Sequence, residues 1–216
     1  MFTRQLTIPL ENGALLENIG GGSVEISPDG LKVAYVARDS SGAEVQLWVR
    51  PLNSMSAIAL PGTEGARFPF WSPDSRYLAF YKDDKLKKVL ATGGPALTLC
   101  DAPAGRGGSW NQDDVIIFTP KFEGPVHSVS AAGGASTAIS VLDSTRQDYT
   151  HRWPSFLPNG RDYLFFNRTE GDDGGEADAI CIGTLGDPQY RVLLHGKSNP
   201  LFAEGRLLFM REGVLM

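Results

Sequence analysis

The stretch Phe70-Trp71-Ser72-Pro73-Asp74-Ser75-Arg76-Tyr77-Leu78-Ala79-Phe80 decides how the chain folds. Its aromatic start, its Ser-Pro-Asp turn and its apolar end predict a strand, a tight turn and a second strand. Proline fixes φ at the first corner of such a turn, and aspartate accepts a local backbone hydrogen bond. The pattern recurs, intact or altered, at 26–36, 110–118, 156–166 and 202–210. The chain is therefore built from repeats of one unit.

The spacing of the repeats predicts the fold. The equivalent positions are Ser27, Ser72, Asn111, Leu157 and Phe202, and they are 45, 39, 46 and 45 residues apart. A period of about 40–50 residues made of short strands is typical of a β-propeller, in which each repeat is one four-stranded blade. We expect an all-β propeller as a single domain over 1–216. Its five blade units are expected at 22–60, 66–100, 106–140, 152–194 and 199–216, with one more strand at 5–10.

Two of the repeated turns lack the glycine that normally ends them. Gly30 and Gly160 supply it in the first and fourth repeats, since glycine adopts a positive φ without steric cost. Ser75 and Asp114 replace it in the second and third repeats. We expect these two turns to be slightly strained or to have a different shape.

The fifth unit has three expected strands and no fourth. If strand 5–10 supplies the fourth, the ring closes with five blades. The alternative is a fragment of a six- or seven-bladed ring, in which case apolar blade faces are exposed. We expect such an open ring to form dimers or to aggregate.

Composition limits the partners and the chemistry. Hydrophobic residues make up 42% and charged residues 21% of the chain, which fits a protein with a core. The net charge of −5 argues against nucleic acid, because phosphate contacts need a basic face. No uncharged apolar run has transmembrane length, and the first residues lack a signal-peptide core, so we expect no membrane contact by this segment. Cys100 and Cys181 fall in different blades and are expected to be free thiols.

Motifs of catalysis and metal binding are absent from the sequence. The serines at 23, 109 and 198 lack the second glycine of a Gly-x-Ser-x-Gly nucleophile motif. The histidines at 127, 151 and 195 do not have a metal-ligand spacing. We therefore predict that this segment is not an enzyme and needs no metal or cofactor.

One column of cations is the candidate site. A cation stands four residues before the aromatic or apolar end of four expected innermost strands; these cations are Arg67, Arg106, Arg152 and Lys197. Innermost strands line the axial channel of a propeller, so equivalent positions meet at one mouth. Together with His151, the column predicts a site for an anion or a carboxylate. The alternative is that each arginine pairs with a neighbouring acid such as Glu64, Asp101 or Asp148.

These motifs resemble the TolB-like, WD40-like (PD40) propeller repeats, whose blades carry Ser-Pro-Asp-Gly before an apolar strand. The matching stretches are 20–30, 47–52, 60–66, 69–75, 100–103 and 151–160. The closest resemblance is to the propeller that follows the kinase domain in bacterial eukaryotic-like serine/threonine protein kinases. The chain itself carries no kinase motif. The resemblance implies the sensor or interaction part of such a kinase, in an extracytoplasmic compartment.

The sequence leaves three functions open. The first is a non-catalytic binding module that takes a protein, a peptide or a small anionic ligand. The second is the gating propeller of a prolyl-oligopeptidase-like hydrolase whose catalytic domain is absent from this chain. The third is a structural fragment without a ligand. We predict the binding module, because a full propeller pattern is present without catalytic motifs and fold alone gives no activity.

Overall fold

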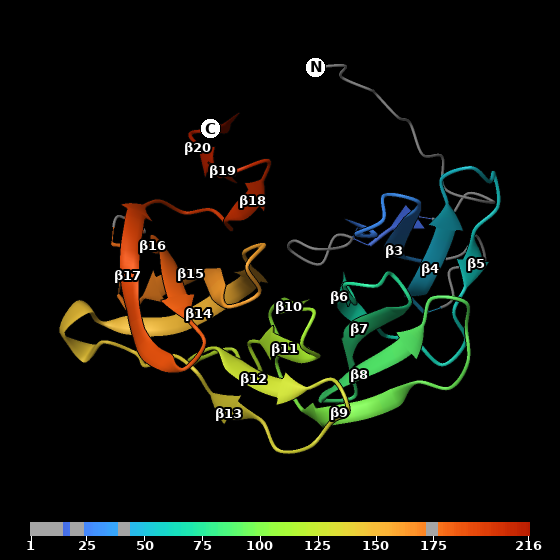
Figure 1. Cartoon of the computed structure of the whole chain (residues 1–216), viewed down its shortest axis with the longest axis horizontal. Coiled ribbons are helices and arrows are strands. Elements are labelled where there is room, and N and C mark those ends of the chain that lie inside the picture. The colour runs from blue at the N-terminus through green and yellow to red at the C-terminus, as the bar shows by residue number, and fades with distance from the viewer. Residues whose placement is uncertain (1–14, 18–23, 39–43, 172–176) are drawn as a thin grey trace.

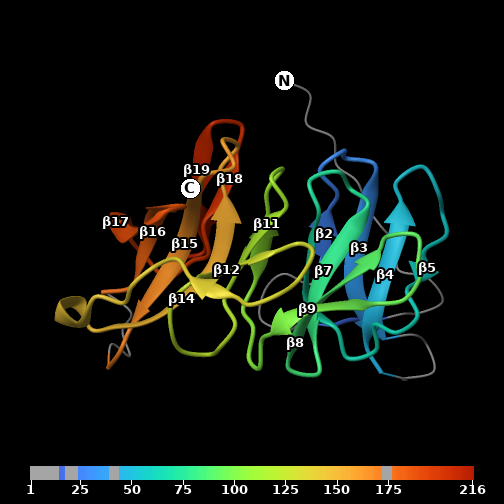
Figure 2. The ribbon, with the colours of Figure 1, turned by 60° about the horizontal axis from the view of Figure 1, so that its bottom comes forward.

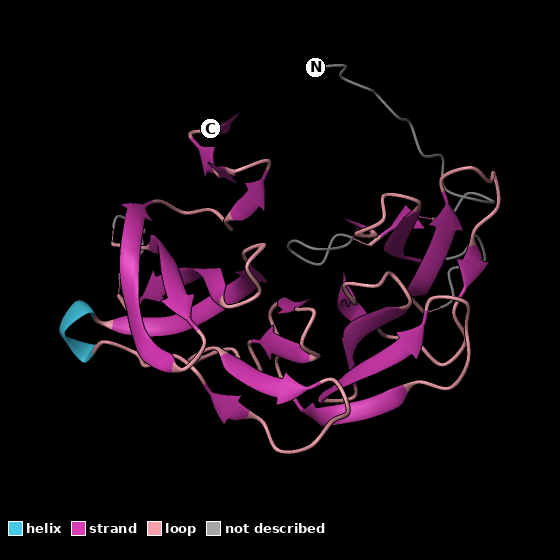
Figure 3. Cartoon of the chain, in the orientation of Figure 1, coloured by secondary structure: helices cyan, strands magenta, loops and turns pink. Residues whose placement is uncertain are grey.

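The computed structural model consists almost entirely of antiparallel strands (Figure 3). It describes residues 15–17, 24–38, 44–171 and 177–216. The helical element within these ranges is a short 3-10 turn, Ser144–Arg146. The strand expected at 5–10 lies outside the described residues.

The first two blade units have the strands that the repeat predicts. The first sheet consists of β2 (Val24–Ile26), β3 (Lys32–Arg38), β4 (Gln46–Pro51) and β5 (Ile58–Ala59), and β1 (Leu15–Leu16) also pairs with β3. The second sheet consists of β6 (Arg67–Trp71), β7 (Tyr77–Lys82), β8 (Lys85–Leu90) and β9 (Leu97–Asp101). From β2 to β5 and from β6 to β9, each strand pairs with the next strand in the sequence, as expected for a blade.

The third and fourth units repeat this meander. The third sheet consists of β10 (Gly108–Trp110), β11 (Val115–Phe118), β12 (His127–Ser130) and β13 (Thr137–Ala138). The fourth consists of β14 (Asp148–Phe156), β15 (Asp162–Thr169), β16 (Ala179–Thr184) and β17 (Asp187–His195). With nine residues each, β14 and β17 are the longest strands in the described part of the chain. β14 contains a register shift between Arg152 and Ser155.

The fifth unit is shorter than the others. Its strands form two pairs, β18 (Leu201–Ala203) with β19 (Arg206–Leu208), and β20 (Met210–Arg211) with β21 (Val214–Leu215). The single strand expected over 206–211 is thus divided into β19 and β20. Phe209 and Met216 exchange backbone hydrogen bonds of 3.2 and 2.8 Å, so pairing extends to the residue before β20 and the residue after β21. The side chains of Leu201 and Leu215 are each 63% exposed.

The five units follow one another in an arc around a common centre (Figure 1). The first strands β6, β10 and β14 lie toward this centre, and the fourth strands β9, β13 and β17 lie at the periphery. The rotated view shows the sheets standing side by side like blades (Figure 2). The chain is therefore a β-propeller, as the repeat predicts.

All of the repeated turns have the same backbone shape at their exit. Gly30 and Gly160 have φ values of 70° and 67°, and Ser75 and Asp114 have 59° and 57°. The two substituted turns are therefore not reshaped. They hold a non-glycine residue in the left-handed region, which costs free energy for a residue with a Cβ atom.

The hydrophobic core lies between the blades. Phe80 of β7, Phe118 of β11 and Phe165 of β15 occupy equivalent positions and have no exposed surface. Each of them belongs to a cluster that joins two neighbouring sheets. Packing of aromatic side chains between blades keeps the first strands aligned around the centre and so positions the site described below.

Candidate functional site

Three of the predicted cations have the same local backbone. Arg67 begins β6, Arg106 stands two residues before β10, and Arg152 lies within β14. Each is followed by a residue with positive φ, which is 48° at Phe68, 71° at Gly107 and 56° at Trp153. Positive φ at an aromatic residue is a strained conformation that the surrounding structure must enforce. The repeat therefore preserves one bend in the inner strand.

The bend brings the three arginines into one pocket. The pocket has a volume of about 530 Å³ and is lined by Arg67, Arg106, Arg152, Arg168, Phe68, Phe122 and Trp153. We call it the arginine pocket. Three different blades thus contribute a guanidinium to it, as the column predicts.

Aromatic faces and carbonyl oxygens hold these guanidiniums in place. The central carbon of the Arg152 guanidinium lies 4.4 Å from the centroid of the Phe122 ring, and that of Arg106 lies 5.3 Å from the same centroid. The Nη2 of Arg152 donates a hydrogen bond of 3.2 Å to the carbonyl oxygen of Phe122. The Nη1 of Arg106 donates one of 2.9 Å to the carbonyl oxygen of Gly105. These contacts orient the cations without neutralising them.

No carboxylate among the described residues forms an ion pair with any arginine of the pocket. The acids that the alternative interpretation named have other partners. Glu64 pairs with Lys82 at 3.3 Å, and Asp101 pairs with Lys85. Asp148 is buried beside His151. Within the described residues, no direct contact with a carboxylate therefore compensates the positive charge of the arginine column.

The pKa of Arg152 reports the crowding of positive charge. Burial lowers the pKa of its guanidinium, and the nearby Arg168 and Arg106 lower it further. Asp178 offsets part of this at longer range, while its carboxylate accepts the backbone N–H of Thr169. An anion that entered the pocket would relieve this repulsion.

Arg168 is a member of the pocket that the column did not include. It lies on β15, where its backbone is opposite Thr150 of β14. Arg152 is two residues further along β14, so the hairpin brings the two arginines together. Counting paired residues back from the turn at 157–160 places Arg168 at the end of the blade where Arg152 lies. The register shift in β14 sets which residue pairs with Arg168, and this shift cannot be read from the sequence. Phe122 was also missed, because it belongs to the loop between β11 and β12.

The other two predicted residues lie elsewhere. His151 has no exposed surface, and its Nδ1 lies 2.7 Å from the Oγ of Ser140. Its Nε2 lies 3.5 Å from an Oδ atom of Asp148, which is close enough for attraction but is not a hydrogen bond. Lys197 is exposed and does not line the arginine pocket. The predicted column therefore corresponds to a three-blade site.

A second cavity shows that the inner strands converge. It has a volume of about 490 Å³, and we call it the axial groove. Every blade unit lines it; the contributions include Glu25 of β2, Trp71 of β6, Trp110 of β10, Ser155 of β14 and Leu201 of β18. Phe68 and Trp153 line both the axial groove and the arginine pocket, so the two cavities share a wall.

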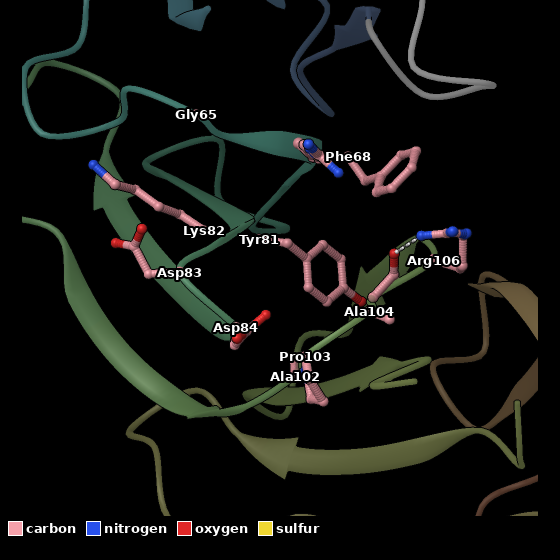
Figure 4. Close-up of a pocket in the computed structure, with 12 residues that line it drawn as sticks. Gly65, Phe68, Tyr81, Lys82, Asp83, Asp84, Ala102, Pro103, Ala104 and Arg106 are labelled. Carbon is pink, nitrogen blue, oxygen red and sulfur yellow. Dashed lines mark hydrogen bonds between the residues drawn. The ribbon is translucent and has the colours of Figure 1, made fainter. Parts of the chain in front are cut away.

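A third, smaller cavity flanks the arginine pocket (Figure 4). Its volume is about 260 Å³, and it shares Arg67, Phe68 and Arg106 with that pocket. The ring of Tyr81 points toward Ala104 and Arg106, whereas Lys82 extends away from it. The hydroxyl of Tyr81 donates a hydrogen bond of 2.6 Å to the carbonyl oxygen of Gly107, which fixes the bend beside Arg106.

No group of three or more His, Cys, Asp or Glu side chains among the described residues is arranged to hold a metal ion. No helix within them is long and apolar enough to span a membrane.

Comparison with solved structures identifies the class of fold. The chain superposes on TolB from Acinetobacter baumannii with a TM-score of 0.69 at 14% sequence identity, over 94% of this chain and 52% of that one. A putative TolB from Agrobacterium tumefaciens gives a TM-score of 0.62 at 15% identity, over 87% of this chain and 68% of that one. A puromycin hydrolase gives 0.60 at 15% identity, over 86% of this chain and 32% of that one.

The chain therefore has the fold of TolB-like propellers and of the propeller domains of prolyl peptidases. It spans about half the length of the first of these TolB structures. At these identities the likeness establishes the fold alone. Neither a scan against protein families nor a search of curated proteins found a match.

Proposed function

We propose that this chain is a non-catalytic binding module whose ligand presents carboxylates to the arginine pocket. The ligand is either a small polycarboxylate or an acidic stretch of a peptide or protein. The observation that carries the proposal is the set of four guanidiniums that no carboxylate of the described residues contacts, in a chain whose net charge is −5. The planar guanidinium fork matches a carboxylate in a bidentate geometry, so several forks select a ligand with more than one anionic group.

The aromatic side chains support this proposal. Phe122 is 42% exposed, and its ring makes cation–π contacts with the guanidiniums of both Arg106 and Arg152. This stacking holds two long side chains in place before a ligand arrives, which lowers the entropy lost on binding. Such preorganisation is typical of a binding site.

The experiment is a titration of the purified chain with tricarballylate and, separately, with a short oligo-aspartate peptide. We expect binding that weakens with added salt. The variant with Arg67, Arg106 and Arg152 all replaced by Gln is expected to lose at least tenfold in affinity for whichever probe binds. Arg191→Gln is the matched control, because Arg191 is an exposed residue of β17 outside the arginine pocket.

Two results contradict the proposal. One is equal affinity of the triple variant and the wild type, which means that the probes bind elsewhere. The other is the absence of binding of both probes at low salt. Melting temperatures of all variants show whether a lost affinity reflects lost folding.

The resemblance to kinase-associated propellers gives the proposal a biological setting. In that setting the module is the extracytoplasmic sensor of a signalling kinase, and occupation of the arginine pocket is the sensed event. This finer assignment is tested by the sequence encoded upstream of this chain, which is expected to contain a transmembrane segment and a kinase domain. A hydrolase domain encoded next to it contradicts the assignment.

The second candidate is a gating propeller of a prolyl-oligopeptidase-like hydrolase. It is favoured by the likeness to puromycin hydrolase and to a prolyl endopeptidase, the latter with a TM-score of 0.56. A gating propeller controls the passage of substrate and does not need an anion site. Binding of tricarballylate that depends on the arginines therefore favours the first candidate.

A further inference from the structure

Glu25 is an acidic side chain in the axial groove. It lies on β2, whose backbone pairs Glu25 with Ala34 of β3. Its carbonyl oxygen accepts a hydrogen bond of 3.1 Å from the Nε1 of Trp71, which fixes β2 against the second blade. Its side chain is half-buried and lines the groove.

The carboxylate of Glu25 has no cation or hydrogen-bond donor in contact among the described residues. Burial raises its pKa from 4.5 to about 7, and no nearby cation lowers it again. Asp29, in the turn that follows β2, is by contrast paired with Ser27 and Lys32. Glu25 is a half-buried acid without such a partner among the described residues.

The walls around Glu25 suit a cationic group on an apolar stem. The aromatic residues Trp71, Trp110 and Trp153 line the same groove. Five prolines line it as well; these are Pro28, Pro69, Pro73, Pro154 and Pro200. Indole faces attract ammonium and guanidinium groups, and a carboxylate within an apolar wall strengthens this attraction because little water screens it.

The groove adjoins the arginine pocket, since Phe68 and Trp153 line both cavities. One extended ligand can therefore contact both cavities. Its two ends meet opposite charges, since one cavity presents arginines and the other presents Glu25.

We propose that Glu25 binds an ammonium or guanidinium group of the same ligand whose carboxylates occupy the arginine pocket. The ligand class is a dipolar, extended peptide segment with a basic residue at one end, an apolar or proline-rich middle and acidic residues at the other. This inference rests on the proposed function for its acidic end. It adds the polarity of the ligand and a specificity residue in another blade.

The test uses synthetic peptides with a lysine, an alanine-proline spacer and two terminal aspartates. Spacers of several lengths are used, because each extended residue spans about 3.3 Å. Each peptide is compared with its twin in which the lysine side chain is acetylated, which removes the charge and leaves the stem. We expect the wild type to prefer the unmodified peptide by about tenfold at the best spacer length.

Glu25→Gln is expected to abolish this preference and to leave the affinity for the acetylated peptide unchanged. Glu44→Gln is the matched control, since Glu44 is an exposed residue of the same blade unit outside the groove. Glu25→Asp keeps the charge on a shorter side chain and is expected to retain part of the preference. The melting temperature of each variant separates a binding effect from a folding effect.

The outcomes distinguish the two proposals. If the wild type binds both peptides of every pair equally, and binding depends on the arginines, the role of Glu25 is refuted and the carboxylate site stands. If Glu25→Gln keeps the full preference, the cation binds elsewhere and the inference is also refuted. If no peptide binds in a way that depends on the arginines, the proposed function itself fails.

Discussion

Arg152 and His151 are consecutive residues of β14 with opposite environments. The guanidinium of Arg152 enters a pocket with three other arginines and contacts no carboxylate of the described chain. The imidazole of His151 has no exposed surface and lies beside a buried acid, Asp148. Successive side chains of a strand point to opposite faces, so one step along the chain separates a solvent-facing cavity from the space between blades.

The contrast between these two environments distinguishes a polar group that stabilises the fold from one that can bind a ligand. The carboxylate of Asp148 accepts hydrogen bonds from the backbone N–H of Asp143, from Asn167 and from Tyr190. Both carboxylate oxygens of this buried acid therefore accept hydrogen bonds from the blade or from the loop before it. The arginines of the pocket, by contrast, have no carboxylate in contact among the described residues. A polar group satisfied by the protein stabilises the fold, whereas one left unsatisfied at a cavity is available to a ligand.

The largest expected effect comes from Asp148→Ala. The change removes the acceptor for Tyr190, Asn167 and the backbone of Asp143 at a site where the Asp148 side chain has no exposed surface. Leaving buried donors without a partner costs about 3–5 kcal/mol of the free energy of unfolding. Urea denaturation measures this loss.

Asp101→Ala is the control for that prediction. It also removes a carboxylate that pairs with a cation, but the Asp101 side chain is 82% exposed. An exposed ion pair contributes at most about 1 kcal/mol. Equal losses for the two variants would mean that the environment of Asp148 does not stabilise the fold, and the distinction drawn between the two faces of β14 would fail.

These two faces also explain what the sequence could predict. Arg67, Arg106 and Arg152 occupy equivalent positions of successive repeats, and they become neighbours in space because a propeller rotates each repeat about one axis. Three blades of the site therefore follow from the repeat alone. His151 was assigned to the pocket because it adjoins Arg152 in sequence, although strand alternation sends it to the other face. Lys197 precedes an inner strand of only three residues, Leu201–Ala203, in a unit shorter than the others.

Arg168, Phe122 and Glu25 depend on three-dimensional details that spacing does not encode. Arg168 needs the register shift of β14, and Phe122 needs the path of a loop. The sequence shows an acid at position 25 but not that its side chain lies in the groove without a partner. The fold was predictable because turns and alternating apolar residues are local signals, whereas pocket membership beyond the repeat is a product of packing.

An intermediate effect is expected from pH through His151. Burial lowers the pKa of its imidazole, and attraction to Asp148 offsets only part of this. Below the ordinary histidine pKa of about 6.5, His151 therefore binds fewer protons in the folded state than in the unfolded state. The stability that neutral His151 contributes at about pH 7 is lost as the pH falls. Burial alone would raise the pKa of Asp148. Attraction to the His151 ring and the hydrogen bonds from Tyr190, Asn167 and the backbone of Asp143 hold that pKa below its ordinary value. The loss through Asp148 has the same sign and begins nearer pH 4.

The measurement must separate His151 from Glu25. The raised pKa of Glu25, about 7, has the opposite sign, because its folded state gains protons and stability as the pH falls from 7 toward 4.5. As the pH is lowered from about 7 to about 5, we therefore expect the free energy of unfolding of Glu25→Gln to fall more steeply than that of the wild type. Over the same range, we expect that of His151→Gln to fall less steeply than that of the wild type. Parallel pH profiles for the wild type and His151→Gln would show that His151 is not held neutral by burial.

The smallest expected effect on stability is that of Arg152→Gln. The variant loses one hydrogen bond to the carbonyl oxygen of Phe122 and the stacking on its ring, but it also removes repulsion from Arg106 and Arg168. These terms oppose one another, so the free energy of unfolding is expected to change by less than about 1 kcal/mol. Added salt is expected to stabilise the wild type more than the variant, since salt screens repulsion between like charges. If Arg152→Gln lowered the free energy of unfolding as much as Asp148→Ala, Arg152 would have a structural partner. The two faces of β14 would then not differ in kind.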